Sequence, residues 1–168
     1  TEITKLLLNN NNIDVNIINM GDRFIQITAL YCAVKNNNTE ITKLLLNNNN
    51  IDVNTINIDG EGNKSTALYC AVKNSNTEIT KLLFNNDNID VNIINIGKTI
   101  IYIALENDDT ELLQFLLTKY KSKINANALN YEKGRNSFYL KTLLFLAIEK
   151  ENLEIIKLLL SIDGIDVN

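Results

Sequence analysis

Two kinds of short apolar segment alternate along the chain, separated by breaks rich in asparagine. One reads TEITKLLL at 39–46 and the other reads TALYCAVKN at 28–36. In both, apolar residues recur three and four positions apart, which places them on one face of a helix. These positions are Ile41, Leu44 and Leu45 in the first segment and Leu30, Ala33 and Val34 in the second. Helices this short are unstable alone in water, so each must pack against neighbouring segments.

The segments belong to an internal repeat. The sixteen residues TEITKLLLNNNNIDVN at 1–16 return unchanged at 39–54, and 77–92 differs from them only at Phe84 and Asp87. A segment that recurs every 38 residues predicts an array of stacked helix pairs. We expect one array over 1–168, of about five repeats with partial first and last repeats. The first helices are expected near 28–37, 66–75, 99–108 and 142–151, and the second helices near 1–9, 39–47, 77–85, 110–119 and 153–161.

The asparagines fall where the helices must end. Asparagine tolerates the left-handed conformation that ends a helix, and its side chain can cap the next helix. Asn37, three residues before Glu40, fits such a cap at the start of a second helix. An aggregation-prone asparagine tract is the alternative interpretation. The runs are short and in phase with the repeat, which favours helix ends.

The recurring phrases resemble the ankyrin repeat. The matching threonine, aliphatic and alanine positions are Thr28, Leu30 and Ala33; Thr66, Leu68 and Ala71; Thr99, Ile101 and Ala104; and Thr142, Leu144 and Ala147. The family's proline is replaced by Ala29, Ala67, Ile100 and Leu143, and its histidine by Tyr31, Tyr69, Tyr102 and Phe145. The family's glycine between the helices is replaced by polar residues such as Asn37 and Ser75.

This resemblance implies an all-α fold, an ankyrin-repeat solenoid of stacked antiparallel helix pairs with finger-like loops on one edge. It also implies a non-catalytic module that binds another protein through the finger loops and the concave face. The alternative is a regulatory or tethering ankyrin segment of a larger enzyme or channel lying outside this fragment. A third hypothesis is an array without a selected partner, expanded by duplication.

Four stretches differ between copies although the helices barely do, and they lie where the family places its fingers. We call them the first to fourth fingers, and they cover 17–27, 55–65, 93–98 and 128–141. Each carries glycine at a turn: Gly21, Gly60 or Gly62, Gly97 and Gly134. Such divergence is typical of a binding edge on a fixed scaffold. Loops that drift because nothing packs on them would look the same.

The fourth finger is the longest and the richest in residues that anchor protein interfaces. Its candidate partner-binding residues are Tyr131, Arg135, Phe138 and Tyr139, although Phe138 or Tyr139 could instead pack over the helices. Weaker candidates are Arg23 and Phe24 in the first finger, and Lys35, Lys73, Glu106 and Lys150 shortly after the repeated alanines.

Composition narrows the function classes. The net charge of −4 gives no electrostatic reason to bind nucleic acid or an anionic membrane surface, and no apolar run is long enough for membrane insertion. The chain has no histidine, which excludes imidazole bases and the usual triads, and we expect no enzyme, no metal site and no cofactor. Cys32 and Cys70 occupy one repeat position and are expected to be buried thiols, in keeping with a cytoplasmic, monomeric module.

Two motif-like stretches in the second finger are set aside. GEGNKST at 60–66 lacks the glycine before lysine that a phosphate loop needs, and no parallel sheet is expected here. The alternating acidic and amide residues at 57–63 resemble calcium ligands. The bidentate carboxylate would have to stand at Leu68, a core residue.

Overall fold

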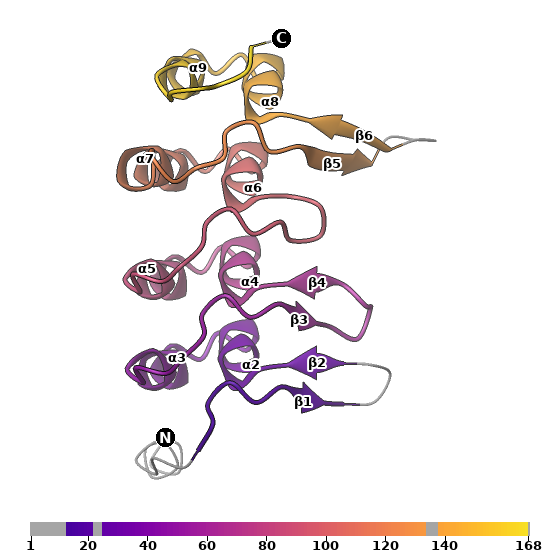
Figure 1. Cartoon of the computed structure of the whole chain (residues 1–168), viewed down its shortest axis with the longest axis vertical. Helices are drawn as coiled ribbons and strands as arrows, with labels where there is room; N and C mark the ends of the chain where they lie inside the picture. The colour runs from indigo at the N-terminus through magenta and orange to yellow at the C-terminus, as the bar shows by residue number, and fades with distance from the viewer. Residues whose placement is uncertain (1–12, 22–24, 134–137, 168) are drawn as a thin grey trace. The chain divides into compact units, whose positions relative to one another are not determined.

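The computed structural model describes residues 13–21, 25–133 and 138–167 (Figure 1). The second helix expected near 1–9 lies outside the described residues. The chain divides into two compact units, Thr1–Asp90 and Val91–Asn168, which are described one at a time.

The first unit contains two helix pairs and two fingers. Its helices are α2 (Ala29–Lys35), α3 (Thr39–Leu46), α4 (Ala67–Lys73) and α5 (Thr77–Phe84). Helix α2 packs on α4 and α3 packs on α5, so the pairs stack. The fingers contribute strands β1 (Asn19–Met20), β2 (Gln26–Ile27), β3 (Asn57–Ile58) and β4 (Lys64–Ser65). All four strands are antiparallel and form one sheet, because Gln26 pairs with Ile58 across the two fingers.

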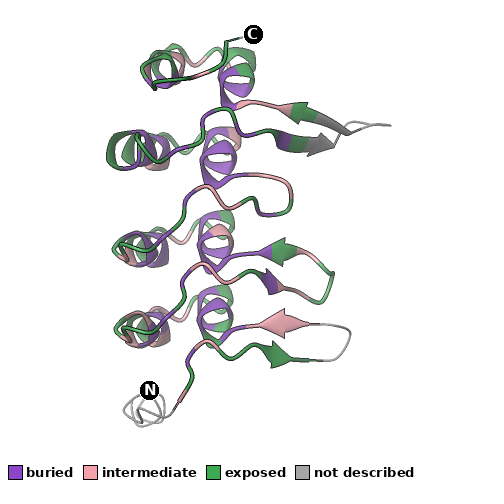
Figure 2. Cartoon of the chain, viewed as in Figure 1, coloured by how far each residue is buried: buried purple, intermediate pink, exposed green. Residues whose placement is uncertain are grey.

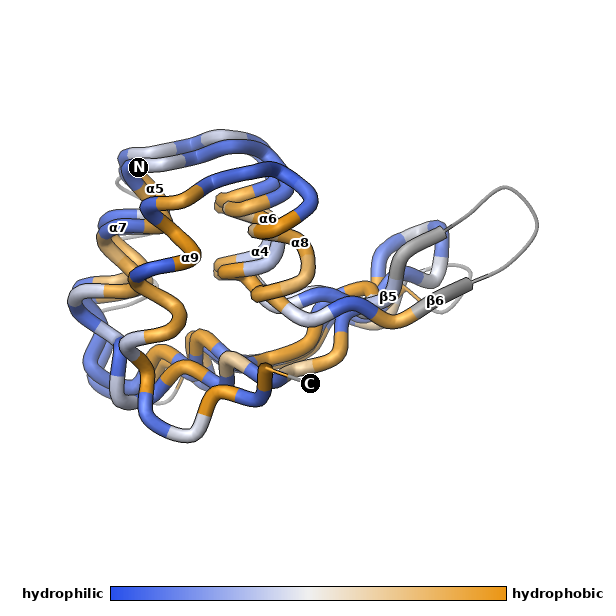
Figure 3. Tube along the Cα trace, turned by 90° about the horizontal axis from the view of Figure 1, so that it is seen from above, coloured by the Kyte–Doolittle hydropathy of each residue, from blue (hydrophilic) through white to orange (hydrophobic). Residues whose placement is uncertain are grey.

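The second unit repeats this plan with different fingers. Its helices are α6 (Ile100–Glu106), α7 (Thr110–Lys119), α8 (Leu143–Glu149) and α9 (Leu153–Leu160). The fourth finger forms the hairpin of β5 (Asn130–Lys133) and β6 (Phe138–Lys141). Helices α6 and α8 lie between the second helices α7 and α9 and this hairpin (Figure 3). The eight helices in the described part of the chain therefore confirm the predicted fold of stacked helix pairs with finger loops.

A threonine begins every described first helix. Its hydroxyl accepts a hydrogen bond from the backbone N–H three residues later, which satisfies one of the free donors of the first turn. The pairs are Thr28 with Tyr31, Thr66 with Tyr69, Thr99 with Tyr102 and Thr142 with Phe145, at 3.2–3.4 Å. These caps compensate for the missing proline at the first helical position.

The break between the two helices differs from the prediction. Asn38, and not Asn37, caps the second helix, since its side chain accepts from Ile41 N–H at 3.0 Å. Asn37 instead takes the left-handed conformation, with φ 53°, and so brings Asn38 N–H to the carbonyl of Ala33. Ser75, Asp108 and Glu151 have the same conformation in the other repeats.

The first-helix stripe is confirmed and the second-helix stripe needs a correction. Leu30, Ala33 and Val34 are all buried, and Figure 2 shows the first helices as the most buried elements. In α3, Leu45 is buried as expected, but the fully buried position beside it is Thr42 and not Leu44. The Thr42 hydroxyl donates to the carbonyl of Asn38 at 2.8 Å, so its polar group carries little cost inside.

Asparagines after the second helices clamp each loop to the next. In the first unit, Asn54 donates from its amide to the carbonyl of Asn88 at 2.7 Å and accepts from Asp90 N–H at 2.9 Å. In the second unit, Asn92 does the same with Lys123 and Asn125. The asparagine of the recurrent IDVN phrase thus satisfies loop backbone that has no helix or sheet partner.

Candidate functional site

Each finger exposes an aliphatic side chain near its base. These residues stand two positions after the asparagine clamp, and each is between 40% and 52% exposed. They are Ile18 and Ile56 in the first unit and Ile94 and Leu129 in the second. We call this set the apolar finger row. Single exposed apolar residues are normal on a protein surface, but one at the same place in every repeat is a feature of the repeat itself.

A buried asparagine, which sequence reasoning missed, ties the second and the fourth finger to the start of a first helix. In the first unit, Asn57 accepts from Thr28 N–H at 2.7 Å and donates to the carbonyl of Thr55 at 2.8 Å. In the second unit, Asn130 makes the same contacts with Thr99 N–H and the carbonyl of Ala128, both at 2.8 Å. The available signal was an asparagine directly after each exposed aliphatic residue.

The third finger turns within two residues. Asn95 and Lys98 exchange backbone hydrogen bonds, and the residues between them, Ile96 and Gly97, have φ 51° and 80°. Such a turn normally uses asparagine followed by glycine, because both central residues need positive φ. A β-branched residue in this conformation is strained. Ile96 is nevertheless 42% exposed, so burial does not explain its presence.

Tyr131 packs against this turn and remains half exposed. Its N–H donates to the carbonyl of Gly97 at 2.8 Å, and a Cβ on Gly97 would lie only 2.9 Å from the Cβ of Tyr131. Glycine is required here both for its φ and for this close approach. The side chain of Tyr131 is thereby held against Gly97 of the turn, with 55% of the residue exposed.

The other predicted finger residues fall where the structure gives no side-chain detail. Arg135, Arg23 and Phe24 lie outside the described residues. Phe138 and Tyr139 belong to strand β6, and only their backbone is described. Of the fingers, Gly62 takes positive φ in the second and Gly97 in the third, whereas Gly134 is also outside the described residues.

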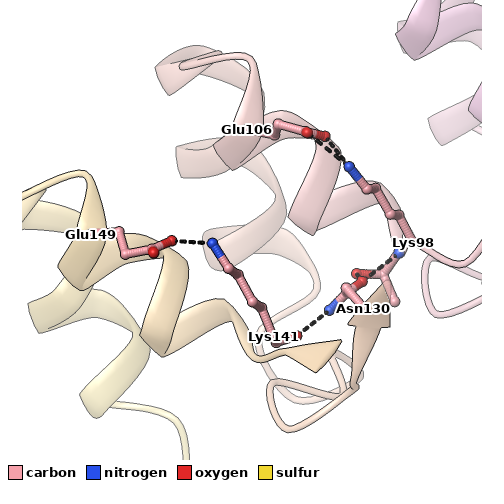
Figure 4. A network of polar contacts seen from close by, with 6 residues as sticks. Lys98, Glu106, Asn130, Lys141 and Glu149 are labelled. Atoms are coloured by element: carbon pink, nitrogen blue, oxygen red, sulfur yellow. Dashed lines mark hydrogen bonds and ion pairs between the residues drawn. The ribbon is translucent and has the colours of Figure 1, made fainter. Parts of the chain in front are cut away.

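In the second unit, lysine–glutamate bridges cross from each finger to the end of the first helix. Lys98 reaches Glu106 with Nζ–Oε distances of 2.7 and 2.8 Å, and Lys141 pairs with Glu149 in the same way (Figure 4). Each ammonium also lies over a ring of that helix, 5.5 Å from the centroid of Tyr102 for Lys98. The bridges therefore occupy the corner between the finger and its first helix.

In the first unit, the same positions carry lysines without a bridge. Lys35 ends α2 and Lys73 ends α4, and both are exposed. Neither ammonium forms an ion pair with a described residue. The finger position that holds lysine in the second unit holds Ile27 or Ser65 here, and neither side chain carries a charge.

Lys150 is not the equivalent of Lys35. The residue two positions after Ala147 is Glu149, and Lys150 is the next residue, where α8 ends. Its ammonium contacts both carboxylate oxygens of Asp108, at 2.8 and 2.9 Å. Lys150 thus links two neighbouring helix breaks of the second unit.

A buried polar cluster joins α2 to the second finger and α4. The Tyr31 hydroxyl lies 3.1 Å from Ser65 Oγ, and burial raises the pKa of the phenol. Burial also raises the pKa of the Cys70 thiol, against the opposing charges of Lys35 and Lys73. Cys70 is buried as expected, but Cys32 is exposed, because its side of α2 is not covered by a described first helix as α4 is covered by α2. That expectation for Cys32 was wrong.

The calcium-like stretch of the second finger is a hydrogen-bonded turn. Partial burial raises the pKa of Asp59, but hydrogen bonds from Asn63 and Glu61 and the charge of Lys35 outweigh it, and the pKa lies below its usual value. The carboxylate accepts from the backbone N–H groups of Glu61 and Asn63, both at 2.9 Å. Its oxygens are therefore engaged within the loop.

The described residues contain neither a cluster of metal ligands nor a helix suited to a membrane. Among the residues that the structure describes, no group of three or more cysteine, aspartate or glutamate side chains is arranged to hold a metal ion. Within the same residues, no helix is both long and apolar enough to cross a membrane.

Comparison with known proteins identifies the family. The model of the ankyrin repeat family, built from three copies of the repeat, matches residues 1–95, 51–128 and 94–168. The ankyrin repeat domain of Bcl-3, described as a unique member of the IkappaB protein family, superposes with a TM-score of 0.66 at 20% identity. The match covers 99% of this chain and 66% of that domain, and at this identity it supports the fold alone. No curated protein sequence gives a significant match. The chain belongs to the ankyrin repeat family.

Proposed function

We propose that the chain is a non-catalytic protein-binding module of about five repeats, which contacts another protein through its fingers and concave face. The observation that carries this proposal is the apolar finger row. Four fingers each expose a large aliphatic side chain at one position, directly before an asparagine. In the second and fourth fingers this asparagine is buried and anchors the loop. Exposed apolar surface that a rigid loop presents at regular intervals is typical of a protein-interaction edge.

The strained turn of the third finger supports the same proposal. Ile96 holds an unfavourable backbone conformation, although asparagine would fit there without strain. Its side chain is exposed, so the strain brings no gain in core packing. Retention of isoleucine at this point is explained if a partner covers it.

The anchors proposed within this surface are the residues expected from the sequence. Tyr131 is the leading one, because it is half exposed and its backbone is fixed on Gly97. Arg135, Phe138 and Tyr139 of the fourth finger and Arg23 and Phe24 of the first finger remain proposed contacts. Lys35, Lys73, Glu106 and Lys150 are proposed as weaker contacts around them.

Affinity capture with the intact protein tests the proposal. One variant replaces the apolar finger row with serine, at Ile18, Ile56, Ile94 and Leu129. A control replaces Leu153 and Leu160 of α9 with serine, since these aliphatic residues are also exposed, by 70% and 51%, but lie on a second helix. We expect the finger variant to lose most captured protein, because truncation of interface anchors costs roughly 2 kcal/mol or more each. Circular dichroism checks that both variants fold.

The outcome that would overturn the proposal is retention of the same partners by the finger variant. Loss of capture by the α9 control alone would place the interface on the second helices instead. Ile96→Asn gives a sharper reading, because it should raise stability while it weakens capture. An increase in both would show that Ile96 does not contact the partner.

A further inference from the structure

The first unit carries two lysines at the ends of neighbouring first helices that form no ion pair with a described carboxylate. Lys35 and Lys73 occupy the same repeat position on α2 and α4, and these helices pack side by side. The charges of both act on the buried thiol of Cys70 in α4. Tyr69, one turn before Lys73 on α4, is partly exposed, with its ring centroid 5.9 Å from Lys73 Nζ.

In the second unit, the charges at the same corner between finger and first helix neutralise one another, and we call this corner closed. There, glutamates stand at the helix ends and lysines from the fingers bridge to them (Figure 4). In the first unit the signs at the helix ends are reversed, and the finger positions are Ile27 and Ser65, which have no charge to offer. The corner of the first unit is therefore cationic and open, and it has no internal counterpart among the described residues.

Nearby acids do not cancel this charge. Asp59 of the second finger is within electrostatic range of Lys35, but its carboxylate accepts hydrogen bonds from Glu61 and Asn63 and forms no ion pair with the lysine. Asp59 and Glu61 instead limit the cationic surface to a small area at the lysines. A continuous polyanion would meet Asp59 and Glu61 beside the lysines and a chain with net charge −4.

We infer that Lys35, Lys73 and Tyr69 form a docking strip for an acidic segment of another protein. The segment would place carboxylates at the two ammonium groups and an apolar side chain on the Tyr69 ring. A peptide can set its charges at these two points and avoid the acidic finger, which a nucleic acid backbone cannot do. The inference rests on the proposed function and names the chemistry of the partner in the first unit.

Selection from a random peptide library displayed on phage tests this inference with the full chain as bait. We expect the selected peptides to be enriched in Asp and Glu over the unselected library. The double variant K35Q/K73Q should lose this enrichment. The matched control K43Q/K81Q removes the same charge from the second helices of the same repeats, and it should keep the enrichment.

Titration of the most enriched peptide by fluorescence anisotropy gives the size of the effect. The double variant should bind about fivefold to tenfold more weakly than the parent, because two exposed ion pairs are lost. Raising the salt from about 50 mM to about 300 mM should weaken the parent but barely affect the double variant. Rebuilding the closed corner with I27K/K35E should also weaken binding.

Several results would overturn the inference. These are recovery of no peptides, recovery of peptides without acidic enrichment, or equal binding by K35Q/K73Q. Displacement of the peptide by single-stranded DNA of the same charge would indicate a general polyanion surface and would also overturn it. Failure here together with loss of capture in the finger variant would leave the proposed function intact, so the two can be told apart.

Discussion

The two units share one scaffold but finish the corner between finger and first helix in opposite ways. In the second unit, Lys98 and Lys141 are tied to glutamates at the helix ends, over the rings of Tyr102 and Phe145. In the first unit, the helix ends carry lysines that make no such pair with a described residue. The scaffold therefore constrains where a side chain stands and leaves its charge free to vary.

The fingers differ in a second way. The two fingers of the first unit pair with each other in one sheet, whereas those of the second unit comprise a two-residue turn and a longer hairpin. The buried asparagine is an element common to both units, because it ties the second and the fourth finger to the threonine that begins the preceding first helix. A conserved anchor with variable loops lets binding surfaces change without loss of stacking.

The largest effect should follow removal of that anchor. Asn130→Ala should lower the free energy of unfolding by about 3 kcal/mol, because it leaves the buried Thr99 N–H unpaired, and Asn57→Ala by about 2 kcal/mol. The difference is expected because Asn130 also contacts the Thr99 hydroxyl and the carbonyl of Lys141. Urea denaturation measures both, with the exposed Asn88→Ala as control. Equal costs at all three positions would contradict the anchor.

The closely packed alanine of the first helices should respond equally to enlargement in both units. Ala71 and Ala104 occupy one repeat position and are fully buried. Replacement of either by leucine should cost about 1–3 kcal/mol, since the packed seam has no room for the added methylenes. Lys73→Ala on the exposed side of α4 should change stability by less than about 0.5 kcal/mol. If leucine at either position leaves the protein as stable as the parent, the first helices of the two units are not packed equally closely.

Asparagine at the strained turn should stabilise the second unit, whereas the matched change in the first unit should not be stabilising. Ile96→Asn should raise the free energy of unfolding by about 1 kcal/mol, because asparagine accepts positive φ more readily. Ile58→Asn is the matched change in the first unit, where the residue lies in strand β3, and it should bring no gain. Thermal denaturation compares the two. A gain at both positions would mean that hydrophobic exposure, and not strain, is being relieved.

The sequence predicted the helices well because two signals agree there. The apolar spacing of Leu30, Ala33 and Val34 and the repetition of the segment both require a buried face, and the three residues are buried. The sequence was less informative at helix ends, because these depend on single residues and not on a periodic pattern. Asn37 and Asn38 are both good caps by composition, and only the left-handed turn decides that Asn38 is the cap.

The candidate site was less predictable for a physical reason. Exposure of Ile18 or Ile56 cannot be seen in a sequence where many other isoleucines are buried, and the asparagines that fix the fingers are few among many. The ion pair of Lys98 and Glu106 joins residues eight positions apart through a bend, a spacing that helix periodicity does not predict. Tyr131 was identified by residue type alone, and the structure shows that it is half exposed without testing whether it binds.

The closed corner should add a small, salt-sensitive stability that the open corner lacks. Lys98→Gln should cost about 0.5 kcal/mol at low salt, because partly exposed ion pairs contribute little. Lys35→Gln should cost less than this, since no ion pair is broken. The difference between the variants should fall at high salt. A larger cost for Lys35→Gln would mean that this lysine is held by the fold and is not open to a partner.

The smallest effect should be a shift in the titration of Asp59. Partial burial raises its pKa, but hydrogen bonds from Asn63 and Glu61 and the charge of Lys35 hold it below the usual value. A lowered pKa in the folded state stabilises the fold above the unfolded value of about 3.9, and this contribution is lost as the pH falls through the folded pKa.

Because Lys35 forms no ion pair with a described carboxylate, its field should reach Asp59, and Lys35→Gln should raise the Asp59 pKa slightly. Lys43→Gln should leave it unchanged, since Lys43 is paired with Glu78 on the second helices. Carboxyl NMR titration of the parent and the two variants measures these shifts, and Asp59→Asn identifies the signal. An unchanged pKa in the Lys35 variant would show that the ammonium is turned away from the second finger, and the open corner would then be narrower than described.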